Sequence, residues 1–471
     1  MSSIPAEQHN QVFKTTPILI SFLIAGFIGL FSETALNMAL GDLIQVFSIT
    51  PSDVQWLTTG YLLTLGILVP VSGLLMQWFT TRQLFIASLI FSIVGTLIAA
   101  LAPTFGILLA SRVVQAIGTA LLLPLMFNTI LLIFPIHKRG ATMGLMGLVI
   151  MFAPAIGPTI SGIVIENLSW HWIFWICLPF LFFALFFGIA YMQNVSTITK
   201  PKIDIFSIIF STIGFGGIVY GFSSAGENGW GSTIVISTIV IGIIALVLFT
   251  LRQLKMEQPM INLSVFKYPM FTLGLLSVFI TFMVILSSMI LLPLYLQTGL
   301  ALTAVTAGLV LLPGGILNGF MSPITGRIFD KYGPRGLVTP GFIIMIIMLW
   351  LLSNVTTETS IIMVVIMHTF LMIGVSLVMM PAQTNGLNQL PRHLYPDGTA
   401  IMNTLQQVSG AIGTAIAITI MSASQSTYLE TVSNATDRAA LTAGVQDAFI
   451  FGLILAIIGF IMSLFIRSAR A

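Results

Sequence analysis

Long apolar stretches follow one another along the whole chain and are separated by short polar segments. A helix of roughly 20 mostly apolar residues is long enough to cross a bilayer. We identify fourteen such stretches, at residues 17–39, 54–76, 83–102, 105–133, 141–164, 172–193, 204–223, 233–251, 270–296, 304–325, 337–353, 360–383, 399–422 and 446–466. They do not alternate apolar and polar residues as the strands of a membrane barrel do. The pattern therefore predicts an all-α membrane protein with fourteen transmembrane helices.

The longest polar segment on the predicted outer side is 424–445. It contains Ala439, Ala440 and Leu441, which are good helix formers. We expect an amphipathic helix over the outer mouth here, with a mobile loop as the alternative.

The basic residues mark one side of this arrangement. If the N-terminus is cytoplasmic, every Lys and Arg except Arg112 and Arg438 lies in a cytoplasmic segment or close to the cytoplasmic end of a span. Lys and Arg accumulate on the cytoplasmic side of membrane proteins. Both termini are therefore expected in the cytoplasm of a multi-pass plasma-membrane protein. The net charge of +3 then reports topology and does not indicate a nucleic-acid partner.

Composition narrows the function classes further. Of the 471 residues, 57% are hydrophobic and 7% are charged, whereas a soluble domain carries about 25% charged residues. No phosphate-binding G-x-x-x-x-G-K-[ST] loop occurs, which argues against ATP as the energy source. Five His and one Cys offer no metal-ligand spacing. We expect neither an enzyme nor a cofactor.

Two charged residues, Glu33 and Arg112, lie well inside predicted spans. An ionisable group in hydrocarbon is costly and usually faces a bundle interior or a water-filled path. From the predicted span ends, each lies about 9 to 10 Å from the outer surface at 1.5 Å per residue. The pair is thus a candidate proton-coupling site, since burial and a nearby guanidinium shift a carboxyl pKa in opposite directions. The alternative is a static pair that orients two helices.

An internal repeat indicates two halves. The second span ends with Pro70 and Gly73, and the tenth ends with Pro323 and Gly326, 253 residues later in both cases. Each copy follows the second helix of a six-helix set if spans 7 and 8 are an inserted pair. We therefore predict an N-terminal six-helix bundle at 1–193, an inserted pair at 194–269 and a C-terminal six-helix bundle at 270–471. A duplicated bundle is a transporter arrangement.

Several motifs resemble those of the fourteen-span drug/proton antiporter branch of the major facilitator superfamily. Span 4 contains Arg112-x-x-Gln115-x-x-Gly118, and span 1 keeps Thr34 and Asn37 of the family pattern, with the acid displaced by one residue to Glu33. The antiporter motif of span 5 matches at Gly144, Ala153, Gly157, Pro158, Ser161 and Gly162. The loop signature after span 10 matches at Gly326, Asp330, Lys331, Gly333 and Arg335, whereas the first copy has Gln77 in place of the acid.

The resemblance implies the major facilitator fold and proton-driven export of amphiphilic drugs, lincosamide antibiotics among them, by alternating access. The intact loop signature would be a conformational latch, with its carboxylate held near basic groups. Glu33 and Arg112 would couple transport to protons. Further polar residues are candidates for the substrate cavity: Asn37, Tyr61, Gln115, Tyr295, Gln297, Asn403 and Gln407. His368 in span 12 is expected to be a packing histidine, with a proton relay as the alternative.

The expected partners are a small neutral or cationic amphiphile, protons and the lipid bilayer, and we expect the chain to act as a monomer. A rival interpretation is a facilitator, or a proton-coupled importer or exporter, of a small metabolite. Nothing in the charge or hydropathy pattern sets the direction of transport.

Overall fold

The computed structural model describes residues 15–196, 198–433 and 435–468. Within these ranges it leaves out the side chains of Asn37, Gly41, Pro51, Ser52, Pro158, Gly226, Glu227, Asn228 and Ala304. The cavity role predicted for Asn37 and the motif role predicted for Pro158 therefore lie outside the described side chains and stay predictions.

Fourteen helices in the described part of the chain are long and apolar enough to span a membrane. They are α1 (Thr15–Ala35), α3 (Pro51–Trp78), α4 (Thr81–Ala100), α5 (Phe105–Ile133), α6 (Ile136–Asn167), α7 (His171–Tyr191), α8 (Ile205–Asn228), α9 (Thr233–Lys255), α10 (Pro269–Leu294), α11 (Ala304–Tyr332), α12 (Arg335–Leu352), α13 (Ile361–Asn388), α14 (Tyr395–Thr431) and α15 (Asp437–Ser463). The prediction of an all-helical protein with fourteen spans is confirmed.

Local sequence explains where several helices begin and end. Thr50 and Asp53 form a reciprocal capping box at the start of α3, and Thr80 and Gln83 form another at the start of α4. Such boxes satisfy amide groups that have no partner inside the helix. Gly333 ends α11 with a φ of +79°, a backbone conformation that glycine adopts without steric cost.

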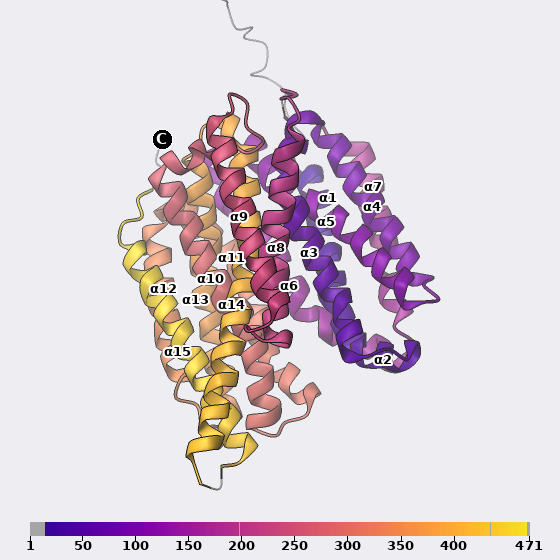
Figure 1. The fold of residues 1–471 in the computed structure, drawn as a ribbon. Coiled ribbons are helices and arrows are strands. Elements are labelled where there is room, and N and C mark those ends of the chain that lie inside the picture. Colours follow the sequence, from indigo (N-terminus) through magenta and orange to yellow (C-terminus); the bar gives the residue numbers. More distant parts are fainter. Residues whose placement is uncertain (1–14, 197, 434, 469–471) are drawn as a thin grey trace, which may run out of the picture.

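Three predicted boundaries were wrong. α1 ends at Ala35 and is followed by a 3₁₀ turn, Leu36–Ala39, and by the short helix α2 (Leu40–Phe47), whereas the sequence predicted one span to residue 39. α11 continues to Tyr332, so most of the predicted loop signature is helical. Segment 424–445 is largely an extension of α14 and α15, which project together beyond the other helices (Figure 1). It does not form a separate helix over the mouth.

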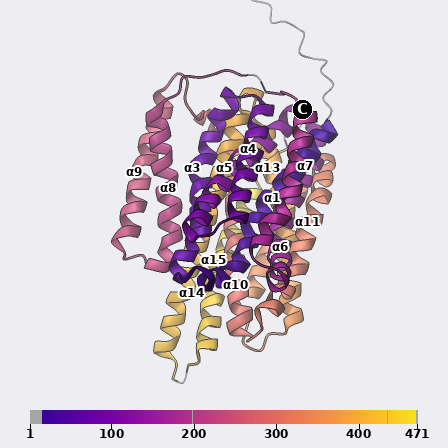
Figure 2. The ribbon, with the colours of Figure 1, turned by 90° about the vertical axis from the view of Figure 1, so that its right-hand side faces the viewer.

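Two helix contacts join the two halves: α6 packs along α11, and α3 packs against α14. We call the interface that these contacts form the seam. The pair α8 and α9 stands to one side of the remaining helices (Figure 2). α8 contacts both α3 and α14: Val219 of α8 packs over Gly66 of α3 and clusters with Val408 of α14. The inserted pair thus covers the α3–α14 side of the seam. The division at 1–193, 194–269 and 270–471 stays our prediction.

We call the end of the molecule that carries the described C-terminal residues, together with Arg82, Lys138 and Lys331, the basic end. It is uppermost in Figure 1. Here α6 and α11 approach at backbone distance: a Cβ added at Gly326 would lie 2.1 Å from the Gly140 carbonyl oxygen. One turn away, a Cβ at Gly144 would lie 2.4 Å from the Ser322 carbonyl oxygen. The two helices are therefore closed against each other at the basic end.

We predict that Gly326→Ala destabilises the protein by about 1–3 kcal/mol, the usual cost of overpacking a close contact. The backbone of Gly140 cannot rotate away as a flexible side chain would. The matched control is Gly308→Ala on the same helix, where an added Cβ meets nothing within 4 Å. Thermal unfolding in detergent measures both variants. Equal unfolding temperatures for the two would contradict the close approach of α6 and α11.

Candidate functional site

Arg112 lies on α5, 1% exposed, with its guanidinium directed at the end of α1. Its Nη1 donates to the carbonyl oxygen of Ser32 (3.2 Å), and its Nη2 donates to that of Glu33 (3.3 Å). Nη1 also donates to the Gln115 side chain (2.9 Å), and Nε donates to the Leu57 carbonyl (3.5 Å). A buried charge needs such acceptors, because an unpaired one is strongly unfavourable.

The acceptors exist because α1 ends at this point. The last carbonyls of a helix have no amide partner within it and carry partial negative charge. Ser32 and Glu33 fall in the last turn of α1, just before the 3₁₀ turn at Leu36–Ala39. Arg112 therefore acts as a cationic cap on α1, bonded to main chain from two different helices, α1 and α3.

Glu33 lies next to Arg112, as their similar predicted depth allowed, but the two side chains do not form an ion pair. The guanidinium bonds to the Glu33 main chain, and the only ion pair among the described residues is Asp204 with Arg252. The depth argument for Glu33 also used the wrong span end, since α1 stops two residues after it. What brings the two residues together is the capping contact. The Glu33 carboxylate is therefore not neutralised by a direct ion pair.

Polar side chains surround this contact inside the N-terminal helices. Tyr61, 1% exposed, places its ring 4.3 Å from the Arg112 guanidinium carbon, a cation–π contact. Its hydroxyl donates to Thr119 Oγ1 (2.8 Å), and the Gln115 amide donates to Thr96 Oγ1 (2.9 Å). Tyr61 and Gln115 were both predicted as cavity residues. In the structure both contact the Arg112 guanidinium and hold it in place.

The span 5 motif joins this site to the opposite bundle. Near the basic end, Gly144 packs on the main chain of α11. Further along α6, a Cβ at Gly157 would lie 2.4 Å from Thr34 Oγ1, beside Glu33, and Gly162 faces Met38. Ala153 is buried, and the Ser161 hydroxyl donates to the Gly157 carbonyl (2.7 Å). α6 therefore contacts both the end of α1 and the α11 seam.

The predicted latch exists as a contact, but its partners differ from those expected. The Asp330 carboxylate at the end of α11 accepts from the main-chain amides of Gly140 and Ala141, both at 2.8 Å. These amides belong to the first turns of α6. Lys331 and Arg335 are exposed and do not bond to this carboxylate. The acid is held by main-chain amides of α6 rather than by basic side chains.

The remaining cavity candidates are scattered. Tyr295 is fully buried, and its hydroxyl donates to the Thr356 carbonyl (2.7 Å), so it ties α10 to the loop after α12. Gln297 is exposed in the turn after α10. On α14, Asn403 is 5% exposed and donates to the Thr399 carbonyl of its own helix (2.8 Å), and Gln407 is half-buried. Of these four, only Gln407 has a partly open side chain on a helix that lines the seam.

Two buried charges at the basic end escaped the sequence prediction. Arg139 of α6 is 3% exposed and donates to Asn388 Oδ1 (2.8 Å) and the Tyr395 hydroxyl (3.0 Å), both in the C-terminal half. Asp397, in the first turn of α14, is also 3% exposed. Both lie near span ends, where charges are usually solvated. Contacts with other segments bury them: Arg139 reaches the C-terminal half, and Asp397 meets the linker at Asn262.

His368, on α13, is 6% exposed and packs against Gly314 of α11. An apolar cavity of about 540 Å³ lies between α1, α6 and α7 and is lined by Phe27, Phe31, Val149 and Phe180, among others. It adjoins the helix that carries Glu33. Within the described ranges, no group of three or more His, Cys, Asp or Glu side chains gathers at metal-binding distance.

Comparison with known proteins places this chain among transporters. Residues 22–414 match the family model of the Major Facilitator Superfamily. The chain is 70% identical to a lincomycin resistance protein of Listeria innocua over 98% of both chains, and 68% identical to one of Bacillus subtilis over 98% of both. It is 28% identical to a multidrug export protein of Haemophilus influenzae, over 85% of this chain and 79% of that one.

A solved structure, that of the human organic anion transporter MFSD10 (TETRAN), has the same fold with a TM-score of 0.68. The likeness covers 96% of this chain and 99% of that one at 12% identity, and it bears on the fold alone. The fourteen spans agree with the family match and with the lincomycin resistance relatives. The chain is therefore a multi-span membrane transporter of the Major Facilitator Superfamily, in its drug-exporter branch.

Proposed function

We propose that this protein exports amphiphilic drugs, lincosamide antibiotics among them, across the plasma membrane in exchange for protons. The observation that carries the proposal is the 70% identity, over nearly the whole length, to a lincomycin resistance protein. The basic end would face the cytoplasm, because Lys and Arg gather on that side. Both termini would then be cytoplasmic, and the chain would work as a monomer without a cofactor.

Glu33 is the proposed proton site. Its carboxylate lies in the membrane interior near Arg112, yet the guanidinium is occupied by main-chain carbonyls and Gln115. Arg112 stays charged under all ordinary conditions, whereas a carboxylic acid can gain or lose its proton. The carboxylate can therefore accept a proton in one conformer and bind a cationic substrate in another. A ligand shifts the equilibrium only through unequal affinity for the two conformers.

The closed basic end supports an alternating-access cycle. Asp330 on the α6 amides, and Arg139 on Asn388 and Tyr395, join the two halves there. Opening the cytoplasmic side requires these contacts to break together. Protonation of Glu33 from outside would favour release of the drug, and loss of the proton inside would permit rebinding.

Drug accumulation in cells tests the function directly. Cells that carry the protein should accumulate less lincomycin than cells without it, and a protonophore should abolish the difference. Purified protein in liposomes should move the drug when a pH gradient is imposed. Greater accumulation in cells with the protein, or transport that ignores the gradient, would favour the rival metabolite facilitator or importer.

We predict that Glu33→Gln abolishes proton-driven efflux while expression and membrane insertion stay intact. The amide keeps the size of the side chain but cannot exchange a proton. The matched control is Glu166→Gln, an exposed acid near the far end of α6. Efflux is measured in liposomes at equal protein density. Wild-type efflux from the Glu33 variant would remove that residue from the coupling mechanism.

We predict that Arg112→Lys lowers transport by at least about tenfold although the positive charge remains. A single ammonium group cannot reproduce the planar fork that serves two carbonyls and Gln115 together. The loss of about one such charge-assisted contact, at 1.5–3 kcal/mol, corresponds to that factor. Thermal unfolding is measured alongside transport. Full activity in the lysine variant would show that charge alone, and not the capping geometry, is required.

A further inference from the structure

The two repeats differ at the position of the latch. In the second copy, Asp330 of α11 bonds to the amides at the start of α6. The corresponding residue of the first copy is Gln77, near the end of α3, and the corresponding partner helix is α14. The helix contact itself is kept on this side, since a Cβ at Gly73 would lie 3.1 Å from Ala400 Cβ. Only the carboxylate that would fasten it is missing.

Gln77 bonds instead to the segment that leads into the inserted pair. The main-chain carbonyl of Gln77 accepts from the main-chain amides of Thr199 (3.1 Å) and Lys200 (3.2 Å). The neighbouring Trp78 donates from Nε1 to the Pro201 carbonyl (2.8 Å). The first linker is therefore fastened to the end of α3.

The second linker, which leads out of the pair, is fastened to α14. The buried Asp397 carboxylate in the first turn of α14 accepts from the main-chain amide of Asn262 (2.9 Å). The Gln253 side chain on α9 accepts from the Ile261 amide (3.2 Å). A chain of contacts thus runs from α9 through the linker to the start of α14.

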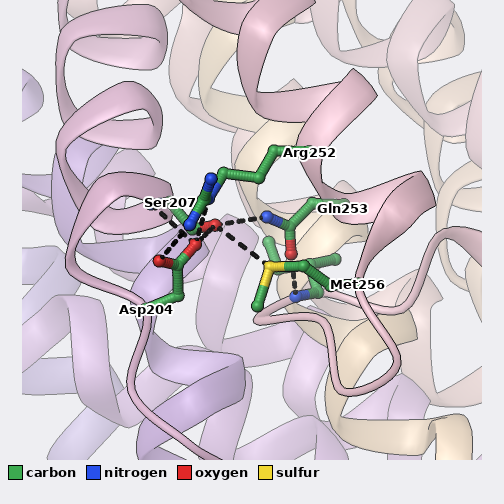
Figure 3. A network of polar contacts seen from close by, with 6 residues as sticks. Asp204, Ser207, Arg252, Gln253 and Met256 are labelled. Atoms are coloured by element: carbon green, nitrogen blue, oxygen red, sulfur yellow. Dashed lines mark hydrogen bonds and ion pairs between the residues drawn. The ribbon is translucent and has the colours of Figure 1, made fainter.

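An ion pair joins the end of the first linker to α9. Asp204, which caps α8, bonds to Arg252 at the end of α9 through Nε (2.5 Å) and Nη2 (2.8 Å). Ser207 donates to the same carboxylate and accepts from Gln253 Nε2 (2.6 Å), as Figure 3 shows. The hydrogen bond from Arg252 holds the pKa of Asp204 well below its ordinary value, so this carboxylate stays charged.

We propose that the inserted pair and its two linkers form a clasp that holds the α3–α14 side of the basic end closed, in place of the charge latch that the first repeat lacks. The clasp runs from Gln77 and Trp78 through the Asp204–Arg252 pair to Asp397. Because α8 also packs on both α3 and α14, separation of the two halves requires at least one of these attachments to yield. The inserted helices thus belong to the set of contacts that must break when the basic end opens.

Distance measurements between spin labels test the clasp. Phe79, 43% exposed just after α3, and His393, exposed just before α14, take the labels as cysteine variants. The native Cys177 is replaced in a Cys177→Ala background, since it is the only cysteine. In nanodiscs without drug or pH gradient, Arg252→Gln and Asp204→Asn should each increase the population at the longer distance by about two- to fivefold, the range that a partly exposed ion pair supports.

Two further variants make the outcome decisive. The double variant Asp204→Asn with Arg252→Gln should lengthen the distance no more than either single change, because both changes remove the same ion pair. Lys255→Gln, an exposed neighbour on α9, should leave the distance unchanged. If Arg252→Gln unfolds the protein, Asp397→Ala tests the other attachment, because alanine removes the acceptor of the Asn262 main-chain amide. Unaltered distances in folded Arg252→Gln and Asp397→Ala would overturn the clasp. The readout needs neither drug nor protons, so it stands or fails separately from the proposed export function.

Discussion

A buried guanidinium that must find acceptors is the constraint around which the N-terminal half is arranged. Arg112 cannot discard its proton, and the membrane interior has no water to solvate it. The broken end of α1 supplies two carbonyls, α3 supplies a third, and Gln115 completes the set. Glu33 lies in the last turn of α1, whose carbonyls meet this need. The acid is thereby brought next to a cation that is already engaged.

Under the proposed function, this arrangement would leave the acid able to respond to protons and substrate. A carboxylate locked in a bidentate ion pair would have little reason to change its protonation state. Because the guanidinium is bonded to the main chain, the charge of Glu33 can vary without dismantling the helix packing around it. α6 connects this site to the basic end, since the same helix contacts Thr34 beside Glu33 and packs on α11 at that end.

Much of the fold was predictable because hydrophobic length alone defines membrane helices. Fourteen spans, the repeat and Arg112 were all visible in the sequence. The acceptors of Arg112 were not, because no Gly or Pro marks the break of α1 at Ala35. The partner of Asp330 was also hidden, since main-chain amides leave no residue-type signal. Arg139 and Asp397 looked like ordinary interfacial charges, because the tertiary contacts that bury them are not visible in the sequence.

Under the proposed function, Glu33 holds a proton that the substrate displaces. Purified protein in weakly buffered detergent solution reports this directly when lincomycin is added. The native protein should release a proton on drug binding, and the Glu33→Gln variant should release none. Equal proton release from both proteins would contradict it, because the exchanged proton would then come from another group.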